Sequence, residues 1–211
     1  MTGRFITLEG GEGVGKSTNL ALVVELVEAA GHQVLTTREP GGTPLAEEIR
    51  DLFLGVREEA VSGLTELLLI FAARAQHLET VIKPALANGT WVVCDRFTDA
   101  TYAYQGGGRG LPVAQIAALE ELVQGPLRPD LTLYLDVPVA VGHARIADRE
   151  HDRVEQEELA FFEAVRSAYR DRAASEGQIQ LVDASGPLES VQEDIRECMA
   201  AFLSESRDPG S

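Results

Sequence analysis

The sequence predicts an α/β fold, with a five-stranded parallel β-sheet covered by helices on both faces. Five short apolar segments among the 211 residues have the length of buried strands, and segments with helical periodicity separate them. A glycine-rich motif typical of phosphate binding follows the first apolar segment. Strands that alternate with helices indicate parallel pairing, because each helical crossover returns the chain to the same end of the sheet.

The predicted elements follow one another without an internal repeat or a low-complexity segment. The expected strands span residues 4–9, 33–36, 91–94, 131–135 and 179–182. The expected helices span residues 16–30, 44–53, 65–87, 112–124, 138–147, 157–174 and 188–204. Ligands of such sheets bind at the carboxyl ends of the strands, so the informative residues should follow the strands.

The first strand and the first helix flank the most specific motif in the chain. An apolar run from Phe5 to Leu8 leads into G-x-x-x-x-G-K-S, from Gly10 to Ser17, and an amphipathic helical pattern then continues to Gly31. Glycines let backbone N–H groups turn toward phosphate oxygens, and the helix N-terminus adds a positive dipole. This context predicts a P-loop NTPase-type sheet, and a plain glycine-rich turn is the weaker alternative.

Residues after two of the strands suggest how phosphates and a metal ion are held. Lys16 is placed to reach the outer phosphates, and the Ser17 hydroxyl can hold Mg²⁺. After the third strand, Asp95 stands where a P-loop enzyme places a carboxylate near Mg²⁺. The adjacent Arg96 offers a planar fork that suits a phosphate. The alternative for this pair is a structural ion pair at the end of a strand.

Composition and charge restrict the class of protein. The net charge of −16 argues against a nucleic-acid partner, and only Lys16 and Lys83 are lysines. Cys94 and Cys198 are isolated and lack metal-ligand spacing, which favours a reducing, cytoplasmic setting. The longest apolar run, Leu67 to Ala73, is too short to span a membrane, and the N-terminus shows no signal peptide.

Two further loops are candidates for the binding site. Residues 37–44 form a turn-rich segment that carries the Arg38–Glu39 pair and ends at Pro44, which suits the first position of a helix. This segment is either a surface turn or part of the site. Residues 97–110 are rich in hydroxyl, amide and aromatic groups, which recognise a base or a sugar, and their glycine run should leave the following backbone mobile.

One charged residue lies on an apolar helix stripe. Leu67, Phe71, Arg74, Leu78 and Val81 recur at spacings of four, three, four and three, so the guanidinium points to the buried side. A buried arginine without a partner is costly. It therefore pairs with a carboxylate in the core or faces a ligand, and we favour the ligand.

Residues 145–158 alternate strongly in charge. Arg145, Arg149 and Arg153 are four residues apart, so a helix would align them. A solvated helix with internal ion pairs and a mobile lid that carries arginine to a phosphoryl group explain this pattern equally well.

Taken in order, these motifs resemble those of bacterial thymidylate kinases over nearly the whole chain. The shared segments are Leu8-Glu9-Gly10, Gly15-Lys16-Ser17, residues 38–43, Ala72-Ala73-Arg74, Asp95-Arg96-Phe97, residues 103–110 and Asp152-Arg153-Val154-Glu155. The resemblance implies that the chain phosphorylates dTMP to dTDP with ATP and Mg²⁺ in dTTP biosynthesis. It also implies a homodimer and one kinase domain, residues 1–211, with a short lid at about residues 143–156.

The resemblance also assigns roles to residues. The implied catalytic residues are Glu12, Lys16, Arg96 and Arg149. The implied ATP-binding residues are Gly10, Gly11, Glu12, Gly13, Val14, Gly15, Lys16, Ser17 and Thr18, with residues 183–185 bordering the adenine. The implied dTMP-binding residues are Glu12, Arg38, Pro40, Phe71, Arg74, Arg96, Thr101, Tyr104 and Gln105. The implied metal ligands are Ser17 and Asp95.

Several features depart from the family pattern. A serine common before the Ala103-Tyr104-Gln105 segment is Ala100 here, and the lid is about one residue shorter. Ile70 occupies the place of an aromatic residue that commonly stacks on thymine, with Phe71 one place later. Gly13 stands where some relatives carry a catalytic arginine, so a lid arginine must substitute, and we favour Arg149. The alternatives are a kinase for another nucleotide or a deoxynucleoside, and a nucleotide-controlled switch. An Asn-Lys-x-Asp segment, which recognises guanine, would favour the switch, and the sequence contains none.

Overall fold

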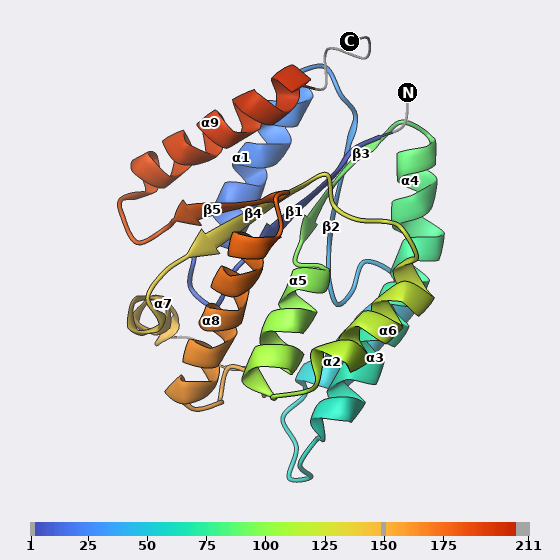
Figure 1. Cartoon of the computed structure of the whole chain (residues 1–211), viewed down its shortest axis with the longest axis vertical. Helices are drawn as coiled ribbons and strands as arrows, with labels where there is room; N and C mark the ends of the chain where they lie inside the picture. Colours follow the sequence, from blue (N-terminus) through green and yellow to red (C-terminus); the bar gives the residue numbers. More distant parts are fainter. Residues whose placement is uncertain (1–2, 149–150, 206–211) are drawn as a thin grey trace.

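The structure of the protein, a computed structural model, describes residues 3–148 and 151–205 (Figure 1). One sheet of five parallel strands forms its centre, with the order β2-β3-β1-β4-β5. The strands are β1 (Phe5–Glu9), β2 (Val34–Arg38), β3 (Trp91–Asp95), β4 (Leu131–Asp136) and β5 (Ile179–Asp183). The predicted fold class is therefore confirmed, and each strand lies within two residues of its predicted bounds.

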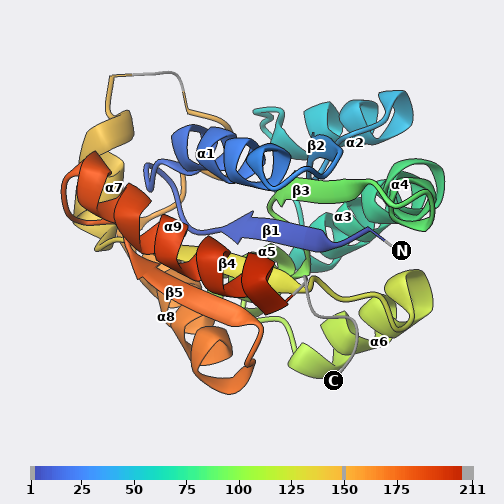
Figure 2. The same ribbon diagram turned by 90° about the horizontal axis from the view of Figure 1, so that it is seen from above.

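Helices cover both faces of this sheet, as Figures 1 and 2 show. The helices are α1 (Lys16–Ala29), α2 (Pro44–Leu54), α3 (Gly63–His77), α4 (Lys83–Ala87), α5 (Thr98–Thr101), α6 (Val113–Gln124), α7 (Val139–Ile146), α8 (Leu159–Ser175) and α9 (Leu188–Glu205). Helices α1 and α9 pack against one face through a core that includes Val23, Leu133 and Ile195. Helices α3 and α8 cover the other face, with Tyr134 and Tyr169 stacked at 4.9 Å. None of the helices in these described ranges is both long and apolar enough to cross a membrane.

The predicted helix over residues 65–87 is interrupted. Between α3 and α4 the chain forms a π-helical segment, Leu78–Ile82. Pro84 lacks an N–H group, and its ring crowds the preceding turn, which fits a wider turn at this point. Ser62 caps the start of α3 by accepting a hydrogen bond from the Thr65 N–H at 3.1 Å.

The glycine run, which we expected to leave the following backbone mobile, is packed against a helix. Residues Tyr102–Gly108 form a second π-helical segment that continues α5 and lies against α8. A Cβ atom on Gly107 would stand 2.7 Å from Ala168 Cβ and 2.8 Å from the Ala164 carbonyl oxygen. A Cβ atom on Gly108 would stand 2.4 Å from the Phe161 ring. The glycines are therefore required for close approach of the two helices.

Gly107→Ala should lower the free energy of unfolding by about 1–3 kcal/mol, because the added methyl group overpacks the contact with α8. Urea unfolding measures this change. Gly177→Ala is the matched control, since a Cβ atom there would meet no heavy atom within 4 Å. Equal free energies of unfolding for the two variants would show that α8 accommodates the added methyl group without loss of stability.

The arginine-rich segment is not one continuous helix. Helix α7 ends at Ile146, and residues 151–158 contain turns but no helix. Arg145 and Arg153 therefore do not share a helical face, and Arg149 lies outside the described residues. The single domain and the lid at residues 143–156 stay predictions.

Candidate active site

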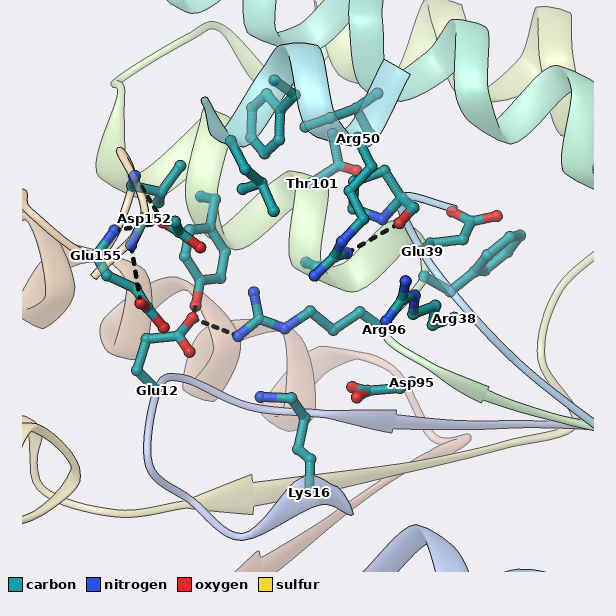
Figure 3. Close-up of a pocket in the computed structure, with 18 of the residues that line it drawn as sticks. Glu12, Lys16, Arg38, Glu39, Arg50, Asp95, Arg96, Thr101, Asp152 and Glu155 are labelled. Atoms are coloured by element: carbon teal, nitrogen blue, oxygen red, sulfur yellow. Dashed lines mark hydrogen bonds and ion pairs between the residues drawn. The ribbon is translucent and has the colours of Figure 1, made fainter. Parts of the chain in front are cut away.

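A cavity of about 590 Å³ opens at the carboxyl ends of β1, β2 and β3. The P-loop forms its floor, and residues from α2, α3, the loop after β3 and the segment after α7 form its walls (Figure 3). Figure 3 shows Lys16, Asp95 and Arg96 converging on the same space. Its size suits a small organic ligand, and its place is the one expected for a parallel sheet.

The P-loop depends on glycine at two close backbone contacts. Gly13 has a φ of +68°, and a Cβ atom there would stand 2.1 Å from the Gly142 carbonyl oxygen. A Cβ atom on Gly142 would in turn stand 2.3 Å from the Glu12 carbonyl oxygen. The P-loop and the first turns of α7 are therefore in direct backbone contact.

Lys16 lies over the P-loop. Its Nζ atom donates to the carbonyl oxygens of Gly10, at 3.2 Å, and Gly11, at 2.9 Å. Burial and the nearby Arg96 charge lower the pKa of Lys16, while Glu12 opposes them. The neighbouring carboxylates offset only part of this shift, so phosphate oxygens near Nζ would stabilise the charged form of Lys16.

Glu12 joins Arg96 and Tyr104 at the centre of the cavity. Its Oε1 atom accepts from Arg96 Nη2 at 2.6 Å and from the Tyr104 hydroxyl at 2.8 Å, and the Arg96 guanidinium lies 4.8 Å from the Tyr104 ring centre. Burial would raise the pKa of Glu12, but Arg96 and Lys16 hold it well below its usual range. Glu12 is thus an anion that fixes the direction of Arg96.

The backbone of Arg96 is held in a left-handed conformation, with a φ of +67°. This conformation is unfavourable for a residue with a side chain, and it is found mainly at functional sites. The buried Glu9 carboxylate stabilises it, because Oε1 accepts from the Phe97 N–H at 2.7 Å and Oε2 accepts from the Tyr169 hydroxyl at 2.8 Å. Burial and the charge of Asp99 raise the pKa of Glu9 to about 7.

Ser17 and Asp95 both line the cavity, as predicted for metal ligands. The buried Oδ1 atom of Asp95 has no hydrogen-bond partner in the described part of the chain. The same part of the chain holds no group of three His, Cys, Asp or Glu side chains that could bind a metal ion alone. These features fit Mg²⁺, which is usually held by one or two protein oxygens together with substrate phosphates.

Positive charge is concentrated on one wall of the cavity. Arg38 and Arg50 line it from β2 and α2, and Arg38 forms an ion pair with Glu47 at 2.8 Å. Arg50 Nη1 donates to the Pro40 carbonyl oxygen at 2.9 Å. Burial and then the charges of Arg38 and Arg96 lower the pKa of Arg50. Arg50 was not predicted from the sequence, where its only signal was its place on the helix that follows the Arg38 loop.

Arg74 is buried, and it meets both of the alternatives raised by the sequence. Its Nε atom donates to Glu39 Oε2 at 2.6 Å, and its Nη2 atom donates to Thr101 Oγ1 at 3.0 Å and to the Phe97 carbonyl oxygen at 3.2 Å. Its Nη1 atom has no partner among the described residues, and the side chain lines the cavity. Arg74 therefore has a carboxylate partner and also a donor that a ligand can use.

Phe71 does not line the cavity. It packs in a separate core cluster with Leu67 and Ile116, and its ring lies 4.8 Å from the Arg74 guanidinium. Ile70 lines the cavity in its place. The position of Phe71 thus argues against the implied contact with a base, because the helix turns its ring behind Arg74.

Helix α7 and the segment after it each contribute an arginine, and the two arginines contact different parts of the chain. Arg145 lines the cavity and donates to the carbonyl oxygens of Gly13 and Ala184, each at 3.2 Å. Arg153 donates instead to Glu66 at 2.7 Å and to the Phe53 carbonyl oxygen at 3.0 Å. These contacts engage Arg153 away from the P-loop. The implied catalytic Arg149 lies outside the described residues.

The cavity brings together most of the residues implied by the sequence. Those that line it are Glu12, Gly13, Val14, Gly15, Lys16, Ser17, Arg38, Pro40, Arg74, Asp95, Arg96, Thr101, Tyr104 and Gln105. Those that do not line it are Gly10, Gly11, Thr18 and Phe71. Asp152 and Glu155 line it without having been assigned a role. Their signal was their place in the Asp152–Glu155 motif.

Comparison with known proteins agrees with this geometry. A family profile described as thymidylate kinase matches residues 8–195. A thymidylate kinase of Pseudomonas savastanoi pv. phaseolicola is 61% identical over 205 residues, which cover 96% of this chain and 98% of that protein. A thymidylate kinase of Teredinibacter turnerae is 56% identical over 96% of this chain and 100% of its own. The chain therefore belongs to the thymidylate kinase family.

Proposed function

We propose that the protein transfers the γ-phosphoryl group of ATP to dTMP, giving dTDP and ADP on the route to dTTP. Family membership supports the reaction, and one observation supports the site: the P-loop and a buried arginine with a spare donor open into the same cavity. An oxygen of the acceptor phosphate attacks the γ-phosphorus, and the bond to the β-phosphate oxygen breaks, so that ADP leaves with the electron pair. No side-chain nucleophile is required.

The residues around the cavity divide between donor and acceptor. The P-loop amides, the start of α1 and Lys16 bind the donor phosphates. Arg96, whose direction is fixed by Glu12, binds the acceptor phosphate in line with the donor. Mg²⁺, held through Ser17 and Asp95, would supply neutralisation of the phosphate charge.

The test is a steady-state assay of ADP formation with ATP and a panel of acceptors. We expect rapid turnover with dTMP, slow turnover with other nucleoside monophosphates and little ATP hydrolysis without an acceptor. Rapid turnover with a deoxynucleoside would favour the alternative acceptor class. Nucleotide binding without turnover for any acceptor would favour a switch.

Arg149→Ala should lower kcat by about 10²-fold and leave the dissociation constant of ATP nearly unchanged. The expected reason is that a lid arginine neutralises charge that develops mainly in the transition state. Single-turnover kinetics and equilibrium ATP binding measure the two effects. Arg153→Ala is the comparison, since Glu66 and Phe53 already hold Arg153. If Arg145→Ala or Arg153→Ala shows this pattern and Arg149→Ala does not, the lid assignment is wrong.

We also propose that the protein acts as a homodimer in the cytoplasm. Leu45 and Leu52 on α2 and Leu64 and Leu68 on α3 are each about half exposed, and the two helices pack against each other. Exposed apolar side chains on adjacent helices are typical of an interface. Both cysteines are free thiols, in keeping with a reducing compartment. Sedimentation analysis of the purified protein measures the oligomeric state.

A further inference from the structure

A buried chain of hydrogen bonds leads from β2 to Arg74. His77 Nε2 lies 2.7 Å from Thr37 Oγ1, and His77 Nδ1 lies 3.1 Å from Glu39 Oε1. Glu39 Oε2 accepts from Arg74 Nε at 2.6 Å. His77, Glu39 and Arg74 are 0%, 4% and 1% exposed, so water does not substitute for these contacts.

His77 completes the set of partners that a buried carboxylate needs. One oxygen of Glu39 is used by Arg74 and the other by the imidazole. Because an ionised carboxylate only accepts hydrogen bonds, Nδ1 of His77 must carry the hydrogen. In this tautomer Nε2 carries no hydrogen and can accept from the Thr37 hydroxyl. Gly42 lies against the ring, and a Cβ atom there would stand 2.4 Å from Nε2, so the ring has little room to turn.

Fixing Glu39 also fixes the free end of Arg74. The guanidinium is a rigid plane, so holding Nε at Glu39 and Nη2 at Thr101 sets the direction of Nη1. The rings of Phe71 and Phe97 lie 4.8 Å and 5.0 Å from its central carbon. Nη1 is thus aimed without a partner of its own among the described residues.

We propose that His77 is a positioning residue for acceptor recognition, which holds Glu39 through its Nδ1–H group and so aims Arg74 at the base of the acceptor. This inference rests on the proposed function, since it assumes a pyrimidine nucleotide in the cavity. His77 does not line the cavity, so it acts through Arg74 and not by contact with the substrate. No sequence motif had pointed to His77.

Two substitutions separate the two ring nitrogens of His77. The amide nitrogen of Asn can occupy the position of Nδ1 and keep the bond to Glu39, whereas the amide of Gln extends toward the position of Nε2. We expect H77Q to raise KM for dTMP by about tenfold or more. We also expect it to lower the ratio of kcat/KM for dTMP to kcat/KM for dCMP. KM for ATP should not change. H77N should stay within about threefold of the wild type, and T37V should have a smaller effect than H77Q.

Thermal unfolding of each variant separates positioning from stability. A folded H77Q with the wild-type preference for dTMP would overturn the inference. Equal loss of preference in H77N and H77Q, in proportion to their loss of stability, would also overturn it. Nitrogen-15 NMR of the wild type gives a readout that needs no active variant, with the His77 signal identified by its loss in H77N. The inference requires the Nδ1–H tautomer, and an Nε2–H tautomer would contradict it. Wild-type protein that does not phosphorylate dTMP would instead contradict the proposed function.

Discussion

Lys16→Ala should lower kcat by about 10²-fold or more while the protein stays folded. Within the described part of the chain the Nζ atom donates to the carbonyl oxygens of Gly10 and Gly11, and the nearby Glu12 keeps its ion pair with Arg96 when the lysine is removed. In the complex the same cation would lie against the outer phosphates of ATP. A preorganised charge of this kind contributes several kcal/mol to the transition state.

The chain offers a matched control for this substitution. Lys83 is the other lysine, and it lies on α4, where it pairs with Glu79 one helical turn away. Lys83→Ala should leave kcat unchanged, because exposed ion pairs of this type contribute little. Circular dichroism of both variants checks that the fold is retained. Near-normal turnover of Lys16→Ala would refute the assignment of the P-loop.

The wild-type enzyme should prefer dTMP over dCMP by as much as about 10⁴-fold in kcat/KM. A thymine carbonyl can accept from the spare Nη1 of Arg74, whereas cytosine presents an amino group at the same edge of the ring. Two donors would then face each other in a buried site, and both would stay unsatisfied. dUMP lacks only a methyl group, so it should be about 10- to 200-fold poorer than dTMP.

Arg74→Lys tests this explanation more cleanly than Arg74→Ala, which would leave the buried Glu39 without its cation. A single ammonium group can pair with Glu39, but it cannot also reproduce the planar fork that Arg74 presents. We expect the preference for dTMP over dCMP to fall by about 10²-fold or more in the lysine variant, with kcat/KM measured for both acceptors. A variant that keeps the full preference would show that Arg74 is a structural ion-pair partner. Equal kcat/KM of the wild type for dCMP and dTMP would refute the role of Arg74 in selecting the base.

The regular parts of this fold are predictable because their signals are local. Each strand is a short apolar run, and Pro44 marks the start of α2 in the sequence as it does in the structure. The π-helical segments and the packed glycine run are different, since they depend on contacts with α8 and on the proline in α4. Such contacts join residues far apart in the chain, so the sequence alone did not show that the glycine run packs against α8.

The candidate site divides in the same way. Lys16, Asp95 and Arg96 follow strand ends, and the cavity contains all three. The orientation of the helix near Arg74 was not predictable to within one residue, so the sequence favoured Phe71 where the cavity has Ile70. The hydrogen-bond partners of Arg74 lie just after β2, in the loop after β3 and in α5, and only the folded chain brings them together.

The contact between Gly13 and Gly142 restricts how this enzyme could have evolved. Any side chain at position 13 would enter the backbone of α7, so an arginine cannot be added to the P-loop by one tolerated substitution. A lineage that acquired a P-loop arginine would first have to displace α7, and with it the segment that carries Arg145. An arginine at position 13 and the present packing of α7 are therefore mutually exclusive, and acquiring such an arginine requires changes at several positions at once.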